Sequence, residues 1–201
     1  AVLVALSSPA FAEVEFDVIG GSEITFEGLL QADSYWYDDD IQRLAGATNA
    51  ATIGDGEDSD FGMRRAELVL KGKGPGMWNW VVGYDANATK WLDVNAMYKF
   101  NAFTFVQFGQ YKQPNSLEEL SSTKNNDFIA KSMGTNLQGI SRRVGLAAGT
   151  GADNWTLTGS LFTRSLTRND GEGNGYGFRG TWAPIFDTNS YLHLGLSYLN
   201  Y

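Results

Sequence analysis

Apolar and polar residues alternate along most of the chain, and the repeat of an amphipathic helix is nearly absent. Between residues 92 and 100, polar Asp93, Asn95 and Lys99 separate apolar side chains at every second position. Successive residues of a β-strand point to opposite faces, so this pattern predicts strands with one apolar face each. The pattern predicts nine strands, at residues 23–37, 63–71, 78–85, 92–100, 103–112, 142–150, 154–163, 176–182 and 191–201.

The expected connections alternate in length. Residues 73–76 and 149–153 are rich in glycine and predict tight turns, and residues 87–90 are a further short connection. By contrast, the connections at residues 38–60, 113–141 and 164–175 are long, and residues 183–189 form one of intermediate length.

Period-two alternation fits either a soluble β-sandwich or a transmembrane β-barrel, and three features favour the barrel. Full charges such as Arg65, Glu67 and Lys99 stand in mid-strand on the polar face, which a water-filled interior tolerates. Short turns alternate with long loops, and aromatic residues gather near strand ends, as in an aromatic girdle. These aromatics are Trp78, Trp80, Tyr84, Trp91, Tyr98, Phe100, Trp155 and Trp182. The sequence therefore predicts an all-β, antiparallel transmembrane β-barrel.

Composition narrows the function classes. The chain has 201 residues and no cysteine, which excludes disulfides and thiolate metal sites. No apolar window of about 18 residues is present, so no transmembrane helix is expected. A formal net charge of -8 argues against a nucleic-acid partner. We expect no metal and no cofactor.

The first twelve residues resemble the end of a secretory signal peptide. An apolar run at residues 1–6 is followed by Ala10-Phe11-Ala12, which fits an A-x-A cleavage site. We expect cleavage after Ala12, a mature chain that starts at Glu13, and export to the periplasm, outer membrane or beyond. The alternative is an apolar N-terminal strand.

Nine strands predict an incomplete barrel. Bacterial single-chain barrels have even strand numbers, and an unpaired strand edge in lipid leaves backbone groups without partners. Tyr201 also falls on the face opposite Leu192, Leu194, Leu196 and Tyr198. Residues 13–201 are thus expected to be the N-terminal part of a longer barrel.

The segment Phe61-Gly-Met-Arg-Arg-Ala-Glu-Leu68 resembles the F-R-R-A-x-L strand of the phosphate- and polyphosphate-selective porins, the O/P porins of Gram-negative bacteria. Similar segments follow in the same order at residues 28–33, 80–85, 92–93, 108–111, 116–124, 159–162, 179–184 and 192–198. The resemblance implies about nine strands of a sixteen-stranded, homotrimeric porin in the outer membrane, in contact with lipid and lipopolysaccharide. It implies passive diffusion of inorganic anions and other small solutes, phosphate or polyphosphate among them.

The resemblance also implies pore-lining residues. Residues 113–141 would be the long loop that folds into the lumen and forms the constriction. Arg65 shares the face of Glu67 and Lys71, whereas Arg64 shares that of Ala66, so Arg64 is expected at a strand end or on a bulge. The matching positions are the paired arginines Arg64 and Arg65, the lumen aspartate Asp93, the hydroxyl donors Ser122 and Thr123, and the adjacent Lys124.

Three positions depart from the family pattern. Glu119 stands where phosphate-selective members carry a lysine, and Leu29 and Thr135 stand where arginines are expected. Two unit charges about 4 Å apart interact by about 4 kcal/mol at an effective dielectric constant near 20. A charge reversal at Glu119 is therefore expected to weaken or abolish phosphate preference.

Other interpretations remain open from the sequence. Residues 113–141 could be a solvated surface loop, and the chain could be an exported soluble β-sandwich or lectin-like binding module. Enzymatic activity has little support, because His193 is the only histidine and no Gly-x-Ser-x-Gly motif is present. We therefore expect no catalytic residues.

Overall fold

The computed structural model describes residues 10–16, 21–36, 59–122, 131–137, 140–168, 171–188 and 190–201. They form one antiparallel sheet of ten strands, in which each strand pairs with its neighbours in the chain. The strands are β1 (Ala10–Phe16), β2 (Glu23–Trp36), β3 (Ser59–Lys73), β4 (Trp78–Asp85), β5 (Lys90–Lys99), β6 (Phe105–Lys112), β7 (Arg142–Ala152), β8 (Trp155–Phe162), β9 (Gly175–Asp187) and β10 (Ser190–Asn200). Two short helices, α1 (Leu117–Leu120) and α2 (Met133–Leu137), lie in the connection between β6 and β7.

The prediction of an all-β, antiparallel fold is confirmed, and each of the nine expected strands is present. The additional strand, β1, pairs in continuous register with residues 24–30 of β2. It begins at Ala10, before the cleavage point expected after Ala12. Cleavage there stays a prediction, and residues 1–9 of the expected signal peptide lie outside the described residues.

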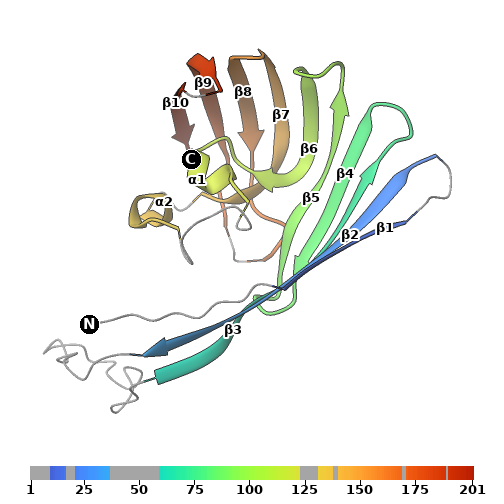
Figure 1. Ribbon diagram of the computed structural model, residues 1–201, viewed down its shortest axis with the longest axis vertical. Coiled ribbons are helices and arrows are strands. Elements are labelled where there is room, and N and C mark those ends of the chain that lie inside the picture. Colours follow the sequence, from blue (N-terminus) through green and yellow to red (C-terminus); the bar gives the residue numbers. More distant parts are fainter. Residues whose placement is uncertain are drawn as a thin grey trace, which may run out of the picture.

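The sheet is curved and, in the described part of the chain, open. β1 and β10 form its two edges and do not pair with each other. Figure 1 shows the strands following one another around the curve, with α1 and α2 on the concave side. The long connection between β6 and β7 thus brings its helices back toward the strands.

Burial in this sheet is the reverse of that in a water-soluble protein. The largest fully buried side chains are the polar Gln110, Gln113 and Asp33. Many large apolar side chains are exposed instead, such as Leu68, Leu157 and Phe178. Because side chains alternate between the two faces of a strand, the apolar residues cover the convex face and the polar ones the concave face.

Bulges shift this alternation in two places that the sequence did not indicate. Gly83 of β4 lies opposite both Leu92 and Asp93, because the register shifts between Val82 and Tyr84. Leu92 is therefore buried on the concave side, and its expected place on the apolar face with Val94 was wrong.

The second bulge lies in β9. Ala183 and Pro184 together oppose His193 of β10, so the strand continues to Asp187 where a connection at residues 183–189 was expected. Proline cannot donate to the ladder, and a bulge is one of the places in a sheet that accept it.

Candidate functional site

A cavity of about 810 Å³ occupies the concave side of the sheet. Side chains from β2 to β6, the start of β7 and the α1–α2 connection line it. Its charged lining residues, counted among the described part of the chain, are eight cations and four carboxylates. The cations are Arg64, Arg65, Lys71, Lys90, Lys99, Lys112, Lys131 and Arg142, and the carboxylates are Glu27, Glu67, Asp85 and Asp93.

A bulge in β3 brings Arg64 and Arg65 to the same cavity. Gln31 of β2 pairs with Arg65, and the next residue, Ala32, pairs with Met63, so Arg64 is the extra residue. An extra residue re-aims the side chains on either side of it, and both arginines line the cavity although they are adjacent in sequence.

The turn after β4 stabilises this bulge. The Asn87 side-chain amide donates to the carbonyl oxygens of Met63 at 2.9 Å and Arg64 at 3.3 Å. Asp85 Oδ1 accepts from the backbone N–H of Ala66 at 3.3 Å and from that of Asn87 at 3.0 Å. These side chains thereby pair backbone groups of β3 beyond Glu67, where its pairing with β4 ends.

Neighbouring carboxylates orient the two arginines. Arg64 Nη1 donates to Asp33 Oδ2 at 2.6 Å, and Gln31 Nε2 donates to the other oxygen of the same carboxylate. Arg65 Nε lies 3.8 Å from Glu67 Oε1. The first contact is a hydrogen-bonded ion pair with a buried partner, which orients the Arg64 guanidinium group.

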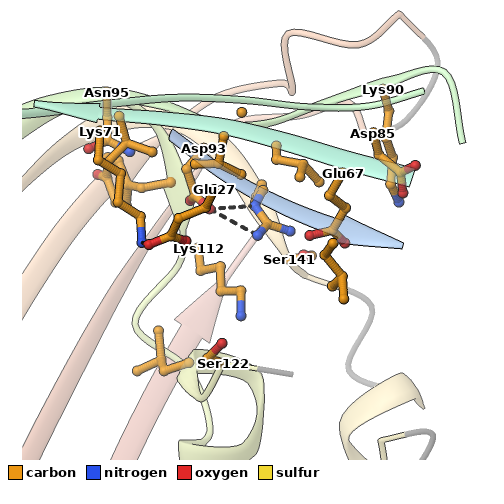
Figure 2. Close-up of a pocket in the computed structure, with 18 of the residues that line it drawn as sticks. Glu27, Glu67, Lys71, Asp85, Lys90, Asp93, Asn95, Lys112, Ser122 and Ser141 are labelled. Atoms are coloured by element: carbon orange, nitrogen blue, oxygen red, sulfur yellow. Dashed lines mark hydrogen bonds and ion pairs between the residues drawn. The ribbon is translucent and has the colours of Figure 1, made fainter. Parts of the chain in front are cut away.

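Asp93 of β5 lies on the cavity wall with Asn95, as the alternation predicts, and it binds an arginine from β7. Arg142 donates to Asp93 Oδ2 from Nε at 3.0 Å and from Nη2 at 2.9 Å. Figure 2 marks these two bonds and shows Lys71 directed toward Glu27 on the same wall. The Lys71 Nζ to Glu27 Oε1 distance is 2.5 Å.

Lys112, at the end of β6, links the connection between β6 and β7 to the cavity wall through hydrogen bonds. Its ammonium group donates to the carbonyl oxygens of Glu119 at 2.7 Å and Ser121 at 3.1 Å. In Figure 2 its side chain extends toward Ser122. The carbonyl groups at the end of α1 lack partners within the helix, and a cation is favoured there.

Two adjacent glutamates of α1 bind the segment before α2. Glu118 accepts hydrogen bonds from the N–H and hydroxyl of Ser132 at 2.6 Å each, and from the Thr135 hydroxyl. These donors hold the pKa of the Glu118 carboxyl below its ordinary value. Glu119 forms an ion pair with Lys131. We call these contacts of Glu118 and Glu119 with residues 131–135 the α1 clasp.

The base of the connection is fixed by a buried polar network around Gln113. Its side-chain oxygen accepts from Ser160 Oγ at 2.7 Å, and its amide donates to the carbonyl oxygens of Tyr111 and Arg143 at 3.2 Å each. The backbone N–H of Gln113 donates to Ser141 O at 3.0 Å, which closes the loop. Fully paired buried networks of this kind specify one arrangement of the chain.

The structure brings four of the predicted site residues to one cavity: Arg64, Arg65, Asp93 and Ser122. Thr123 and Lys124 lie outside the described residues. Glu119 is in α1 as part of the expected loop, but it does not line the cavity. Of the other two departures, Leu29 lies on the cavity wall, and Thr135 belongs to the α1 clasp.

Sequence reasoning did not single out Lys112 or Lys131. Lys112 shares the strand parity of apolar Phe108, so the alternation places it on the wrong face. It lines the cavity nevertheless, as the last residue of β6 and directly before the connection. A lysine directly before a long polar connection is the one feature that marked it.

The described residues contain no group of three or more His, Asp or Glu side chains that fits a metal ion. No helix in the described part of the chain has the length and apolar character needed to cross a membrane. A family model, that of the phosphate-selective porin O and P family, matches residues 35–201. No curated protein matches the chain.

Proposed function

The chain belongs to the phosphate-selective porin O and P family, and from this premise we propose that it forms a water-filled pore in the outer membrane for passive diffusion of small inorganic anions. Phosphate is the anion for which the lining chemistry is best suited. The proposal includes a Gram-negative outer membrane, a complete sixteen-stranded barrel and a homotrimer, with lipid and lipopolysaccharide around it.

The observation that carries the proposal is the charge of the cavity. The whole chain has 15 Lys and Arg against 23 Asp and Glu, yet the cavity lining in the described part reverses this balance, with twice as many cations as carboxylates. A cavity with low-dielectric walls concentrates the field of its lining charges. Local charge, rather than net charge, therefore sets the barrier that a permeating ion meets.

The kinds of donor also suit an oxyanion. Arg64 and Arg65 carry planar guanidinium groups, whose forked N–H groups match the spacing of phosphate oxygens. Lys112 supplies a compact charge in the same cavity as the Ser122 and Ser141 side chains. Carboxylates on the same wall reduce this positive field, so the expectation is a moderate anion preference.

The convex face supports placement in a membrane. Exposed leucines, phenylalanines and tryptophans cover it, whereas a soluble β-sandwich would bury such residues against a second sheet. The described residues form a single sheet. In lipid the β1 and β10 edges need partners for their backbone groups, which a closed barrel supplies.

The experiment is the zero-current potential of the full-length protein in a planar bilayer under a KCl gradient, followed by titration with inorganic phosphate. We expect an anion-selective potential and a fall of chloride current as phosphate is added. Channels with a cation-selective potential would overturn the anion preference, and absence of channels from folded protein would overturn the pore.

A further inference from the structure

The ion pair between Glu119 and Lys131 has two unlike ends. Lys131 lines the cavity, whereas Glu119 is only 5% exposed and lies outside the lining. The negative end of the pair is therefore turned into the α1–α2 connection, and the positive end is turned toward the space that ions would cross.

The surroundings of Glu119 fix this direction. Oε2 of its carboxylate binds Lys131, and Oε1 is buried with no hydrogen-bond partner in the described part of the chain. Its backbone carbonyl accepts from Lys112, and its backbone N–H donates to the Ser116 hydroxyl at 3.2 Å. With both backbone groups bound, the position of Glu119 in α1 is fixed.

We propose that Glu119 is a positioning residue for ion selectivity: it holds Lys131 on the cavity wall and does not itself act as a pore anion. The inference rests on the proposed anion pore and assigns its selectivity to a residue pair. Glu119, although acidic, then supports anion passage, because it orients Lys131, and Lys131 carries the positive charge that faces the cavity.

The arrangement also places two lysines on the same side of the cavity. Lys112 and Lys131 are close enough to interact electrostatically, and α1 lies between their attachment points in the chain. Glu119 contacts both, through its backbone oxygen and its carboxylate respectively. Loss of its side chain would leave Lys112 anchored but release Lys131 from its main carboxylate partner on α1.

A charge exchange tests the inference at constant net charge. The double variant Glu119→Lys with Lys131→Glu keeps an ion pair but turns its negative end toward the cavity. We expect the anion-to-cation permeability ratio of the full-length protein to fall by about two- to fivefold, as two unit charges change on a partly screened wall. An unchanged or higher ratio would overturn the inference.

The chain supplies a matched control. Glu27 and Lys71 form an ion pair in which both side chains line the cavity. Their exchange, Glu27→Lys with Lys71→Glu, moves charge along the wall without changing how much faces the ions, so the ratio should stay near that of the wild type. Wild-type channels without anion preference would contradict the proposed function. If the wild type is anion-selective and the Glu119–Lys131 exchange leaves its permeability ratio unchanged, only this inference is contradicted.

A second measurement covers the case in which the exchanged protein does not fold. The chain has no cysteine, so each thiol introduced into it is the only one that these 201 residues carry. In the Lys131→Cys variant, an anionic methanethiosulfonate reagent added to open channels should reduce the anion current. In the Glu119→Cys variant the same reagent should have little effect. Faster modification of the Glu119→Cys variant would show that position 119 faces the ions and would reject the proposal.

Discussion

Lys112 combines a structural and an electrostatic role in one side chain. Its ammonium group is bound to two backbone carbonyls, which hold its charge in place. Carbonyl groups are dipoles, and a cation bound to them still presents a full unit charge to the surroundings. The same contacts connect the end of β6 to the end of α1.

We predict that Lys112→Met lowers the anion-to-cation permeability ratio by about twofold, because one wall charge is lost in a partly screened site. The variant should also show larger open-channel current fluctuations, since α1 loses its tie to β6. Lys112→Arg is the control: it keeps the charge and donors, and the ratio should remain close to wild type. Single-channel recording measures both properties, and equal ratios for Met and Arg variants would contradict the role.

At the scale of the element, the α1 clasp makes the connection sensitive to acid. The folded state lowers the pKa of Glu118 through its hydroxyl and backbone donors, so the ionised form is the one that folding favours. This stabilisation is present above the pKa of an unfolded glutamate, about 4.3, and is lost as pH falls through the lower folded value.

We therefore predict small fluctuations of the open-channel current at neutral pH and larger ones when the pH is lowered below about 4. Glu118→Gln should show the fluctuations already at neutral pH, because a neutral amide accepts these hydrogen bonds more weakly. Glu23→Gln is the control, since in the described part of the chain Glu23 forms an exposed pair with Lys73 at the opposite end of the strands. Identical recordings from wild type and Glu118→Gln at both pH values would show that the clasp contributes nothing.

A different element-scale feature is the gap left where β6 departs from β5. Pairing between these strands stops at Val94 and Gln110, and residues 90–93 of β5 have no β6 partner. The Gln110 amide donates to the carbonyl oxygens of Trp91 at 2.9 Å and Leu92 at 2.6 Å, and its oxygen accepts from the Leu166 N–H at 2.6 Å. Thr167 Oγ1 accepts from the Trp91 N–H at 2.9 Å. Side chains and one segment of the β8–β9 connection thus replace a missing strand.

Gln110→Ala should destabilise the folded protein by about 1–3 kcal/mol, because two carbonyls and one N–H would lose their partner in a buried place. Gln107→Ala is the matched control: that side chain makes one hydrogen bond, to Asn95 Oδ1 at 2.9 Å, and its loss should cost less. Urea unfolding in detergent, followed by the shift between folded and unfolded electrophoretic mobility, gives both values. Equal midpoints would mean that Gln110 does not seal the gap.

At the scale of the whole molecule, apolar side chains are exposed on the convex face and polar ones are buried on the concave face. Neighbouring residues of one strand should therefore differ in whether they tolerate substitution by a charged residue. Leu157 of β8 is exposed on the convex face, and Thr158 beside it points to the concave face. Leu157→Arg should reduce the folding free energy in lipid vesicles by up to about 4 kcal/mol, depending on its depth, whereas Thr158→Arg should be tolerated. A water-soluble protein would accept the exposed substitution more readily. Vesicle folding yields for the two variants therefore separate the two environments, and equal yields would count against a lipid-facing convex side.

Local alternation predicted nine of the ten strands in the described sheet, because the pattern of each strand depends on its own residues; β1 was not among them. The alternation also showed that Arg64 was out of step with Arg65, and the structure has a bulge at that point. No local pattern marked the bulge at Leu92, since it depends on how β5 pairs with Gly83 of β4. Bulges are set by pairing between strands, so they are hard to read from one strand alone.

The α1–α2 connection shows a second limit. Residues 113–141 were expected to fold inward, and the described part of this connection does line the cavity. The partners of its side chains were not predictable, because Glu119 and Lys131, or Asp93 and Arg142, meet only when distant segments are placed together. Residue type at position 119 indicated an added negative charge; the direction in which it points required the structure.

The β3 bulge determines how closely cationic side chains are spaced along the cavity wall. In a regular strand only every second residue faces one side, so charges there stand at least about 6.6 Å apart along the strand. Arg64 and Arg65 both line the cavity from consecutive positions, which doubles the density of guanidinium groups over that interval. An oxyanion moving along this wall would meet the donors of two guanidinium groups at one depth, where a regular strand would present them at two successive depths.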